Sequence, residues 1–192
     1  MALLERDGKR FVAICRISRS AERLKRSVLR TEILQICSNQ GSYYFGYKLH
    51  VICGLSGVIH SYYLSKASVH DINYLKDIKP LYRDCSIFGD KEYIGAEVQL
   101  DLFETDDIRL ECPYRLNQKN RKSTLIPFVK ARKRVETLFS QLADQFLLIR
   151  NYTKETCGLF ARVVGQISAM SALQYINYMN NNPIRRIKYA LI

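Results

Sequence analysis

Hydrophobic and polar residues follow two periods along the chain, and these predict an ordered mixture of strands and helices. Short runs rich in β-branched and aromatic residues predict strands. The strands expected in this way are residues 11–15, 43–53, 58–64, 86–90 and 108–113. The second and third of these are joined by a short connection that contains two glycines, Gly54 and Gly57. Such a connection predicts an antiparallel hairpin.

Apolar residues at helical spacing predict helices between and after these strands. The helices expected are residues 21–37, 72–78, 95–104, 125–149 and 159–179. Ser20 is a candidate N-cap for the first of them. Strands and helices in this order suit a single domain over residues 1–192, in which helices cover the faces of a mixed sheet. The expected fold class is therefore α/β.

Charge narrows the range of partners. The 192-residue chain has 30 Lys and Arg against 18 Asp and Glu, a net charge of +12. This excess favours a nucleic acid as the partner, with an anionic membrane surface as the weaker alternative. Three basic segments, residues 16–30, 119–134 and 185–188, are candidate phosphate contacts. The alternative is that each is an ordinary solvated face.

Cysteine spacing and hydropathy bear on the location of the protein. The six cysteines are scattered singly, which argues against a zinc site and favours reduced thiols in a cytosolic protein. No apolar run reaches the length of a bilayer span, and the first residues lack the apolar stretch of a signal peptide. We expect a soluble, cytoplasmic protein with no membrane partner.

Two acidic residues stand out by their surroundings. Asp90 ends an apolar strand, and catalytic groups of open α/β sheets gather at such strand ends. Glu136 lies in a basic helical segment near an apolar stripe. Paired carboxylates of this kind suit Mg²⁺ that faces a phosphate-bearing substrate. The alternatives are that Asp90 caps a turn and that Glu136 forms a surface ion pair with Arg132.

Four segments, residues 44–50, 67–71, 88–93 and 130–139, together resemble the DDE transposases of bacterial insertion sequences. The resemblance extends from about Phe11 to the end of the chain. It implies an RNase H-like fold and Mg²⁺- or Mn²⁺-dependent cleavage and strand transfer at the ends of an insertion sequence. The implied partner is double-stranded DNA, both transposon ends and target. The chain would then associate with the bacterial nucleoid, and a homo-oligomer is a further expectation.

The resemblance also implies roles for particular residues. Asp90 and Glu136 match the second and third catalytic, metal-binding acids, and Asp7 is the candidate for the first. The implied DNA contacts are Lys48, Lys130, Arg132, Lys133 and Arg134.

The sequence departs from the family pattern around each of the three acids. Near Glu136, Val129 and Ala143 stand where many relatives have Tyr and Lys. Glu92 replaces a glycine beside the second acid. Asp7 is the only Asp before position 71, and the residues around it match the family poorly, so we expect an incomplete N-terminal part. Two alternatives therefore stay open: an inactive, truncated remnant that binds DNA, and another metal-dependent nuclease of the same fold.

Overall fold

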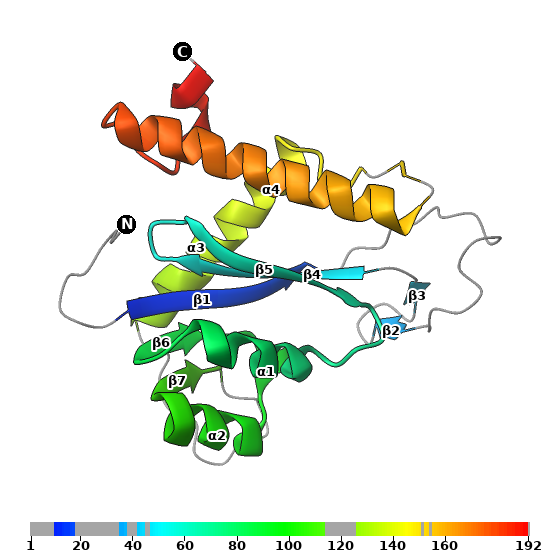
Figure 1. The fold of residues 1–192 in the computed structure, drawn as a ribbon, viewed down its shortest axis with the longest axis vertical. Coiled ribbons are helices and arrows are strands. Elements are labelled where there is room, and N and C mark those ends of the chain that lie inside the picture. Colours follow the sequence, from blue (N-terminus) through cyan, green and yellow to red (C-terminus); the bar gives the residue numbers. More distant parts are fainter. Residues whose placement is uncertain are drawn as a thin grey trace.

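A mixed five-stranded sheet with the order β5-β4-β1-β6-β7 forms the centre of the protein (Figure 1). The computed structural model describes residues 10–17, 35–37, 42–44, 47–113, 126–150, 152–153 and 155–191. The strands of this sheet are β1 (Arg10–Ile17), β4 (Tyr47–Gly54), β5 (Ile59–Lys66), β6 (Cys85–Phe88) and β7 (Ile108–Glu111). Two short strands, β2 (Gln35–Cys37) and β3 (Ser42–Tyr44), form a second sheet.

Strand direction defines two ends of the central sheet. β4 is antiparallel to β1 and to β5, whereas β6 is parallel to β1 and β7 is parallel to β6. β1, β6 and β7 therefore finish at the same end, which we call the carboxyl end. Leu49 of β4 pairs with Ile17 there. The β4–β5 turn lies at the opposite, amino end, because Gly54 pairs with Val12 near the start of β1.

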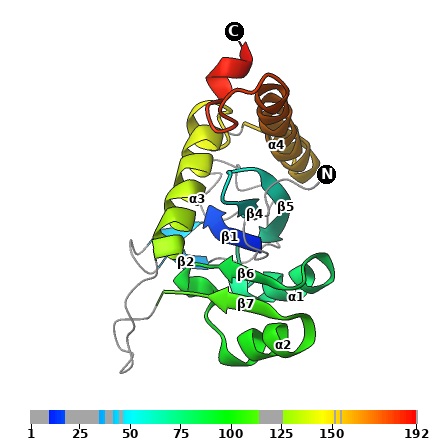
Figure 2. The ribbon, with the colours of Figure 1, turned by 90° about the vertical axis from the view of Figure 1, so that its left-hand side faces the viewer.

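Helices cover both faces of the sheet (Figure 2). The longer ones are α2 (Ala96–Asp106), α3 (Ile126–Asp144) and α4 (Thr156–Met179), and α1 (Tyr74–Ile78) is short. Single 3-10 turns are η1 (Asp71–Asn73), η2 (Lys79–Leu81), η3 (Lys91–Tyr93) and η4 (Ile187–Leu191).

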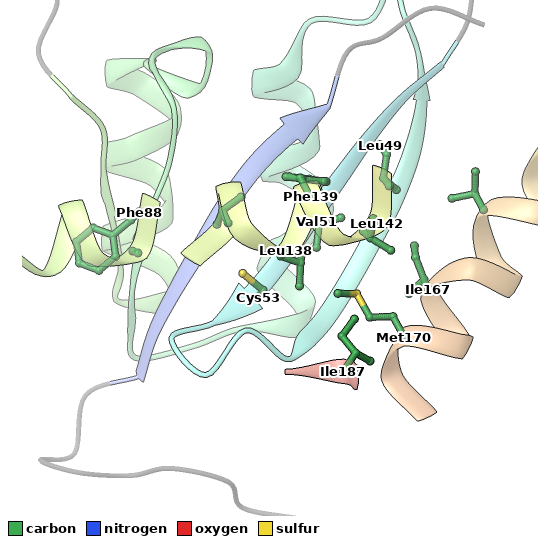
Figure 3. Close-up of a cluster of buried hydrophobic side chains, with 13 residues drawn as sticks. Leu49, Val51, Cys53, Phe88, Leu138, Phe139, Leu142, Ile167, Met170 and Ile187 are labelled. Atoms are coloured by element: carbon green, nitrogen blue, oxygen red, sulfur yellow. The ribbon is translucent and has the colours of Figure 1, made fainter. Parts of the chain in front are cut away.

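Alternation along β4 separates two hydrophobic cores. Leu49, Val51 and Cys53 join the core under α3 and α4, which Figure 3 shows in close-up. Ile52 joins the core under α1 and α2. Because successive side chains of a strand point to opposite faces, a strand covered on both faces must be apolar at nearly every position. Tyr47–Gly54 meets this requirement except at Lys48 and His50.

Most of the expected elements are confirmed. The α/β class, the hairpin and the strands near residues 11–15, 86–90 and 108–113 are present. Three predictions were wrong. Residues 35–37 form a strand and not the end of a helix, and α3 ends at Asp144, before residue 149. The single strand expected over residues 43–53 is divided between β3 and β4, which belong to different sheets. Leu147 has a positive φ of 55°, which is incompatible with a continuing helix. Residues 18–34, with the expected cap Ser20, lie outside the described residues.

α4 is long and predominantly apolar. Among the described residues it is the one helix that is long and apolar enough to cross a bilayer, judged by length and composition alone. The core helix of a soluble protein satisfies the same test. One side of α4 packs into the core through Val163, Ile167 and Met170.

Candidate metal site at the carboxyl end of the sheet

Asp90 lies at the carboxyl end of the sheet, directly after β6, and its side chain is exposed. Hydrogen bonds fix the backbone on both sides of it. The Gly89 N–H donates to the Glu111 carbonyl at 2.9 Å, and the Tyr93 N–H donates to the carbonyl of Asp90 at 3.0 Å. A Cβ at position 89 would lie 3.2 Å from Cys112 Sγ, so β6 and β7 approach closely here. The loop therefore presents a solvated carboxylate on a constrained backbone.

Tyr93 anchors this loop to the sheet. Its side chain is fully buried, and its hydroxyl lies 2.8 Å from His50 Nδ1 on β4. His50 Nε2 lies 2.8 Å from Ser65 Oγ on β5, and the imidazole ring stacks on Tyr74 with centroids 4.9 Å apart. Both ring nitrogens of this buried histidine thus have partners, which is the condition under which burial of polar groups is tolerated.

Lys48 forms a buried ion pair next to this histidine. Its ammonium lies 2.9 Å from Asp71 Oδ1 and donates to the Val69 carbonyl, also at 2.9 Å. Both side chains of the pair are 1% exposed. The expectation that Lys48 contacts DNA was therefore wrong, because a buried ammonium held by a carboxylate does not reach a phosphate. The pair instead joins β4 to η1, which in turn contacts η3.

Three of the segments that carried the family resemblance thus meet in one place. We call Lys48, His50, Ser65, Asp71 and Tyr93 the buried polar cluster. No motif in the sequence connected His50 with Tyr93. A signal was present, because two polar residues two positions apart occupy one face of a strand that is otherwise apolar on both faces.

Glu136 lies on α3, where it is exposed and paired with Arg132. Arg132 Nε donates to Glu136 Oε1 at 2.9 Å, an i,i+4 contact between side chains that are 66% and 59% exposed. Such a pair contributes only about 0.3–0.5 kcal/mol to stability. Structure and sequence agree on this pair, and the carboxylate remains accessible to solvent.

The orientation of α3 decides which end of the sheet Glu136 faces. Arg134 packs on the β4–β5 turn, since a Cβ on Gly57 would lie 3.2 Å from Arg134 Cδ. Residues two apart lie about 200° apart around a helix, so Glu136 is on the opposite flank of α3. Phe139 shares this flank (Figure 3), where it lies toward Leu49 while Leu138 lies toward Cys53. Glu136 therefore faces the carboxyl end, the end at which Asp90 lies.

The remaining candidate DNA contacts differ in their exposure. Lys130 and Lys133 are exposed, and Arg132 is exposed but paired. Arg134 is half-buried, and its Nε has no hydrogen-bond partner among the described residues. Burial, and then repulsion from Arg185, lower the pKa of Arg134. These side chains form a basic surface on α3.

The candidate first acid, Asp7, precedes β1 and is not part of it. Asp7 lies outside the described residues, three positions before the start of β1. Arg10 pairs with Cys85 at the amino end of β6, and continuing this register places Cys15 beside Asp90. Residues 10–17 contain no carboxylate. Over the part of the chain whose side chains are described, no three His, Cys, Asp or Glu residues form a metal-binding group.

The negative charge of Asp90 affects the pKa of Cys112. This thiol follows β7, and burial, followed by the negative charge of Asp90, raises its pKa to about 12. A thiol in this state stays protonated at neutral pH and is a poor metal ligand, because the thiolate is the ligand form. Carboxylates are thus the donors offered at this end of the sheet.

Comparison with known families agrees with this arrangement. Residues 21–171 match the transposase DDE domain. The chain belongs to this family. In this transposase DDE domain the matched residues include Asp90, Glu136 and the whole buried polar cluster, whereas β1 precedes them. No curated protein and no solved structure matches the chain.

Proposed function

We propose that this DDE domain catalyses metal-dependent cleavage and strand transfer of double-stranded DNA at insertion-sequence ends. The observation that carries the proposal is the placement of two accessible carboxylates at one end of the sheet. Asp90 lies there on an anchored loop, and the flank of α3 that bears Glu136 faces the same end. The sheet order, with three antiparallel strands followed by two parallel ones, supports an RNase H-like fold.

Asp90 and Glu136 would hold Mg²⁺ or Mn²⁺, with Asp7 as the proposed third ligand. Carboxylate oxygens are the ligands that Mg²⁺ prefers, so the two described donors fit this ion. When bound, such an ion activates the attacking oxygen and stabilises the leaving oxygen of a phosphodiester. The proposed attacking groups are water in the cleavage step and a DNA 3′-hydroxyl in the strand-transfer step.

The protein residues supply position and charge. Tyr93 and His50 fix the loop that carries Asp90. Arg132 orients the Glu136 carboxylate. Lys133 is exposed near the flank of α3 that bears Glu136 and would contact DNA phosphates there. Lys130 and Arg134 lie toward the opposite flank and are proposed as phosphate contacts farther from Glu136. The proposed location is the bacterial cytoplasm, on the nucleoid while DNA is bound.

Nicking of supercoiled plasmid in Mg²⁺ or Mn²⁺ tests the proposed activity. We expect the wild-type chain to nick the plasmid, and Asp90→Asn and Glu136→Gln each to lose nicking while they keep DNA affinity. Glu104→Gln is the matched control, because Glu104 is an exposed acid on α2 and should retain full nicking. Equal nicking by Asp90→Asn and wild type would contradict the proposal. Joined products would distinguish strand transfer from a plain nuclease.

One observation favours a second candidate function, a DNA-binding remnant that does not cleave. β1 contains no carboxylate, and the position beside Asp90 is occupied by Cys15. Such a remnant would bind DNA with the salt dependence expected of the active enzyme, but it would leave the plasmid intact in both Mg²⁺ and Mn²⁺. Replacing Asp7 by Asn separates the two candidates further, since only an enzyme that uses Asp7 would lose nicking in this variant.

A further inference from the structure

Two arginines from distant parts of the chain meet at the β4–β5 turn, at the amino end of the sheet. A Cβ on Gly57 would lie 3.2 Å from Arg134 Cδ of α3 and 3.9 Å from Arg185 Cγ, which follows α4. Among the described residues no carboxylate pairs with either guanidinium, and Arg134 Nε has no hydrogen-bond partner there. The described part of the chain thus holds two like charges together without a counter-charge.

Amide side chains fix the backbone that carries this pair. Gln174 is buried, and its Nε2 donates to the carbonyl of Gly57 at 3.0 Å. Gln141 Nε2 of α3 donates to the carbonyl of Arg185 at 2.8 Å. Charged groups that are held in advance lose less conformational freedom when a ligand binds. The turn and the segment after α4 are therefore preorganised around the two guanidinium groups.

The segment that follows Arg185 adds positive charge to this region. Asn177 is buried, and its Nδ2 donates to the carbonyl of Arg186 at 3.0 Å. Arg186 Nη1 donates to Tyr189 Oη at 3.2 Å, and this bond lowers the pKa of Tyr189, as do the charges of Arg186 and Lys188. Arg186 and Lys188 are both exposed. An anion near the β4–β5 turn would thus meet a positive potential from several side chains.

We propose that Arg134 and Arg185 together bind a phosphate of the DNA backbone, at a site separate from the candidate metal site. We call it the amino-end arginine site. The planar guanidinium group matches the oxygens of a phosphate in a forked, charge-assisted hydrogen bond. A phosphate at this site would also supply the negative charge that the two arginines lack. The proposal rests on the proposed function only in taking DNA as the ligand, and it does not require catalysis.

The position of the site separates it from DNA at the catalytic end. Arg134 and Glu136 lie on opposite flanks of α3, and a helix with its side chains is about 10–12 Å wide. This width exceeds the Debye length of about 8 Å at physiological ionic strength, so phosphates on the two flanks contribute separately to binding. Lys130 is exposed one turn before Arg134. A row of cations of this kind suits a polyanion, whose charges come in series, better than a single free phosphate.

Fluorescence anisotropy of a labelled duplex without divalent metal, at several salt concentrations, tests the site. Arg185→Gln should reduce the slope of log affinity against log salt by about 1, equally for all sequences. Lys76→Gln is the matched control, because it removes an exposed cation on α1, and it should leave the slope unchanged. An unchanged slope in Arg185→Gln would overturn the proposal.

A double variant tests whether the site is separate. Lys133→Gln combined with Arg185→Gln should reduce the slope by about 2, because each cation contacts its own phosphate. A reduction of only about 1 would mean that both cations contact one phosphate, and it would overturn a separate site. Since no cleavage is measured, a chain that fails to nick plasmid but shows the Arg185→Gln effect would contradict the proposed function and leave this site standing.

Chemical labelling distinguishes the DNA backbone from free phosphate as the ligand. Phenylglyoxal modifies arginine side chains, and mass spectrometry of the peptides locates the modified positions. We expect the duplex to protect Arg134 and Arg185, and inorganic phosphate to give no more protection than chloride at equal ionic strength. Protection by inorganic phosphate in the absence of protection by the duplex would overturn the proposal in favour of a free phosphate.

The competing macromolecule is an anionic lipid surface, because the arginines lie near the end of a long apolar helix. Co-sedimentation with phosphatidylserine vesicles tests this alternative. We expect Arg185→Gln and the wild type to sediment equally with the vesicles. Vesicle binding that Arg185→Gln weakens, together with an unchanged salt slope for DNA, would overturn the proposal in favour of a lipid.

Discussion

At the scale of single residues, the most consequential contacts are those of His50. This side chain joins β4, β5 and the loop that carries Asp90 through two buried hydrogen bonds. Removing one partner of a buried hydrogen bond destabilises the fold by more than the intact bond stabilises it. The polar atom that remains has lost its hydration and has no protein partner in exchange. The geometry of the candidate site therefore depends on side chains that do not themselves touch the metal.

Tyr93→Phe should lower the free energy of unfolding by about 1–3 kcal/mol, because it removes the buried hydrogen bond between the Tyr93 hydroxyl and His50 Nδ1. Urea denaturation measures the difference. Tyr82→Phe is the matched control, since the Tyr82 hydroxyl lies 2.8 Å from Ser61 Oγ in a partly solvated site. Its loss should be smaller, about 0.5–1.5 kcal/mol. Equal losses of unfolding free energy in the two variants would show that the hydrogen bond of Tyr93 in the buried polar cluster contributes no more to stability than the partly solvated one of Tyr82.

Cys112 should react far more slowly with iodoacetamide than Cys157 at pH 8.5. The pKa of Cys112 is raised to about 12 by burial and by Asp90, so little thiolate forms, whereas Cys157 is exposed. Mass spectrometry of the labelled peptides gives both rates. Asp90→Asn should accelerate labelling of Cys112, because one of the two causes of the raised pKa is removed. An unchanged rate in this variant would place Asp90 too far from Cys112 to act on it.

The positions of Asp90 after a strand and of Glu136 on a long helix were predicted from the sequence and are confirmed, whereas the surroundings of Lys48 were not predicted. The catalytic roles of the two acids stay predictions. The two acids were identified from a strand end and from family motifs, and both are accessible. Lys48 was assigned to DNA as one of the contacts that the family resemblance implies. The sequence does not reveal that Asp71, more than twenty positions away, lies 2.9 Å from its ammonium. Long-range ion pairs depend on how elements pack, which local pattern does not encode.

At the scale of elements, the Lys48–Asp71 pair fixes η1 and η3 against β4. The strands were predictable because apolar runs bounded by glycines and polar residues leave few alternatives. The boundaries of the helices were harder. The period of α3 continues past its real end through Phe146, but Leu147 takes a left-handed conformation that ends the helix. Such a conformation has a cost for a leucine, so packing of the segment from Phe146 to Leu148 against the core must compensate for it.

Lys48→Met should destabilise the fold by about 3–5 kcal/mol, because it leaves the Asp71 carboxylate buried without its cation. Equilibrium unfolding of the variant provides the value. Lys79→Met is the comparison, since its partner Asp101 is 53% exposed, and it should cost no more than about 1 kcal/mol. Adding Asp71→Leu to Lys48→Met should recover much of the loss. If the double variant were as unstable as the single one, burial of the unpaired charge would not be the cause.

At the scale of the whole molecule, the net charge of +12 and the basic surface of α3 predict DNA binding that weakens steeply with salt. Each phosphate that is neutralised releases counterions, so the logarithm of the affinity falls with the logarithm of the salt concentration. Lys133→Gln should reduce this slope by about 1. Lys76→Gln, which removes an exposed cation on α1, should leave the slope unchanged. An affinity that does not change with salt would contradict phosphate contact altogether.

The α/β class, the hairpin and the order of the elements followed from the sequence, because hydrophobic period and turn residues determine them locally. The convergence of three separate segments in the buried polar cluster did not follow from it. That convergence requires the strand order, in which β4 lies beside β1 and β1 beside β6. Pattern along one strand indicates which of its faces is polar, but it does not indicate which distant loop meets that face.

The measurement that tests the central claim most directly is a double-mutant cycle on Mn²⁺ affinity. Titration calorimetry of wild type, Asp90→Asn, Glu136→Gln and the double variant gives the four affinities. If both carboxylates hold the same metal site, either single change removes most of the binding and the second change adds little. Independent, additive losses, or loss in only one of the two single variants, would mean that Asp90 and Glu136 do not share a site.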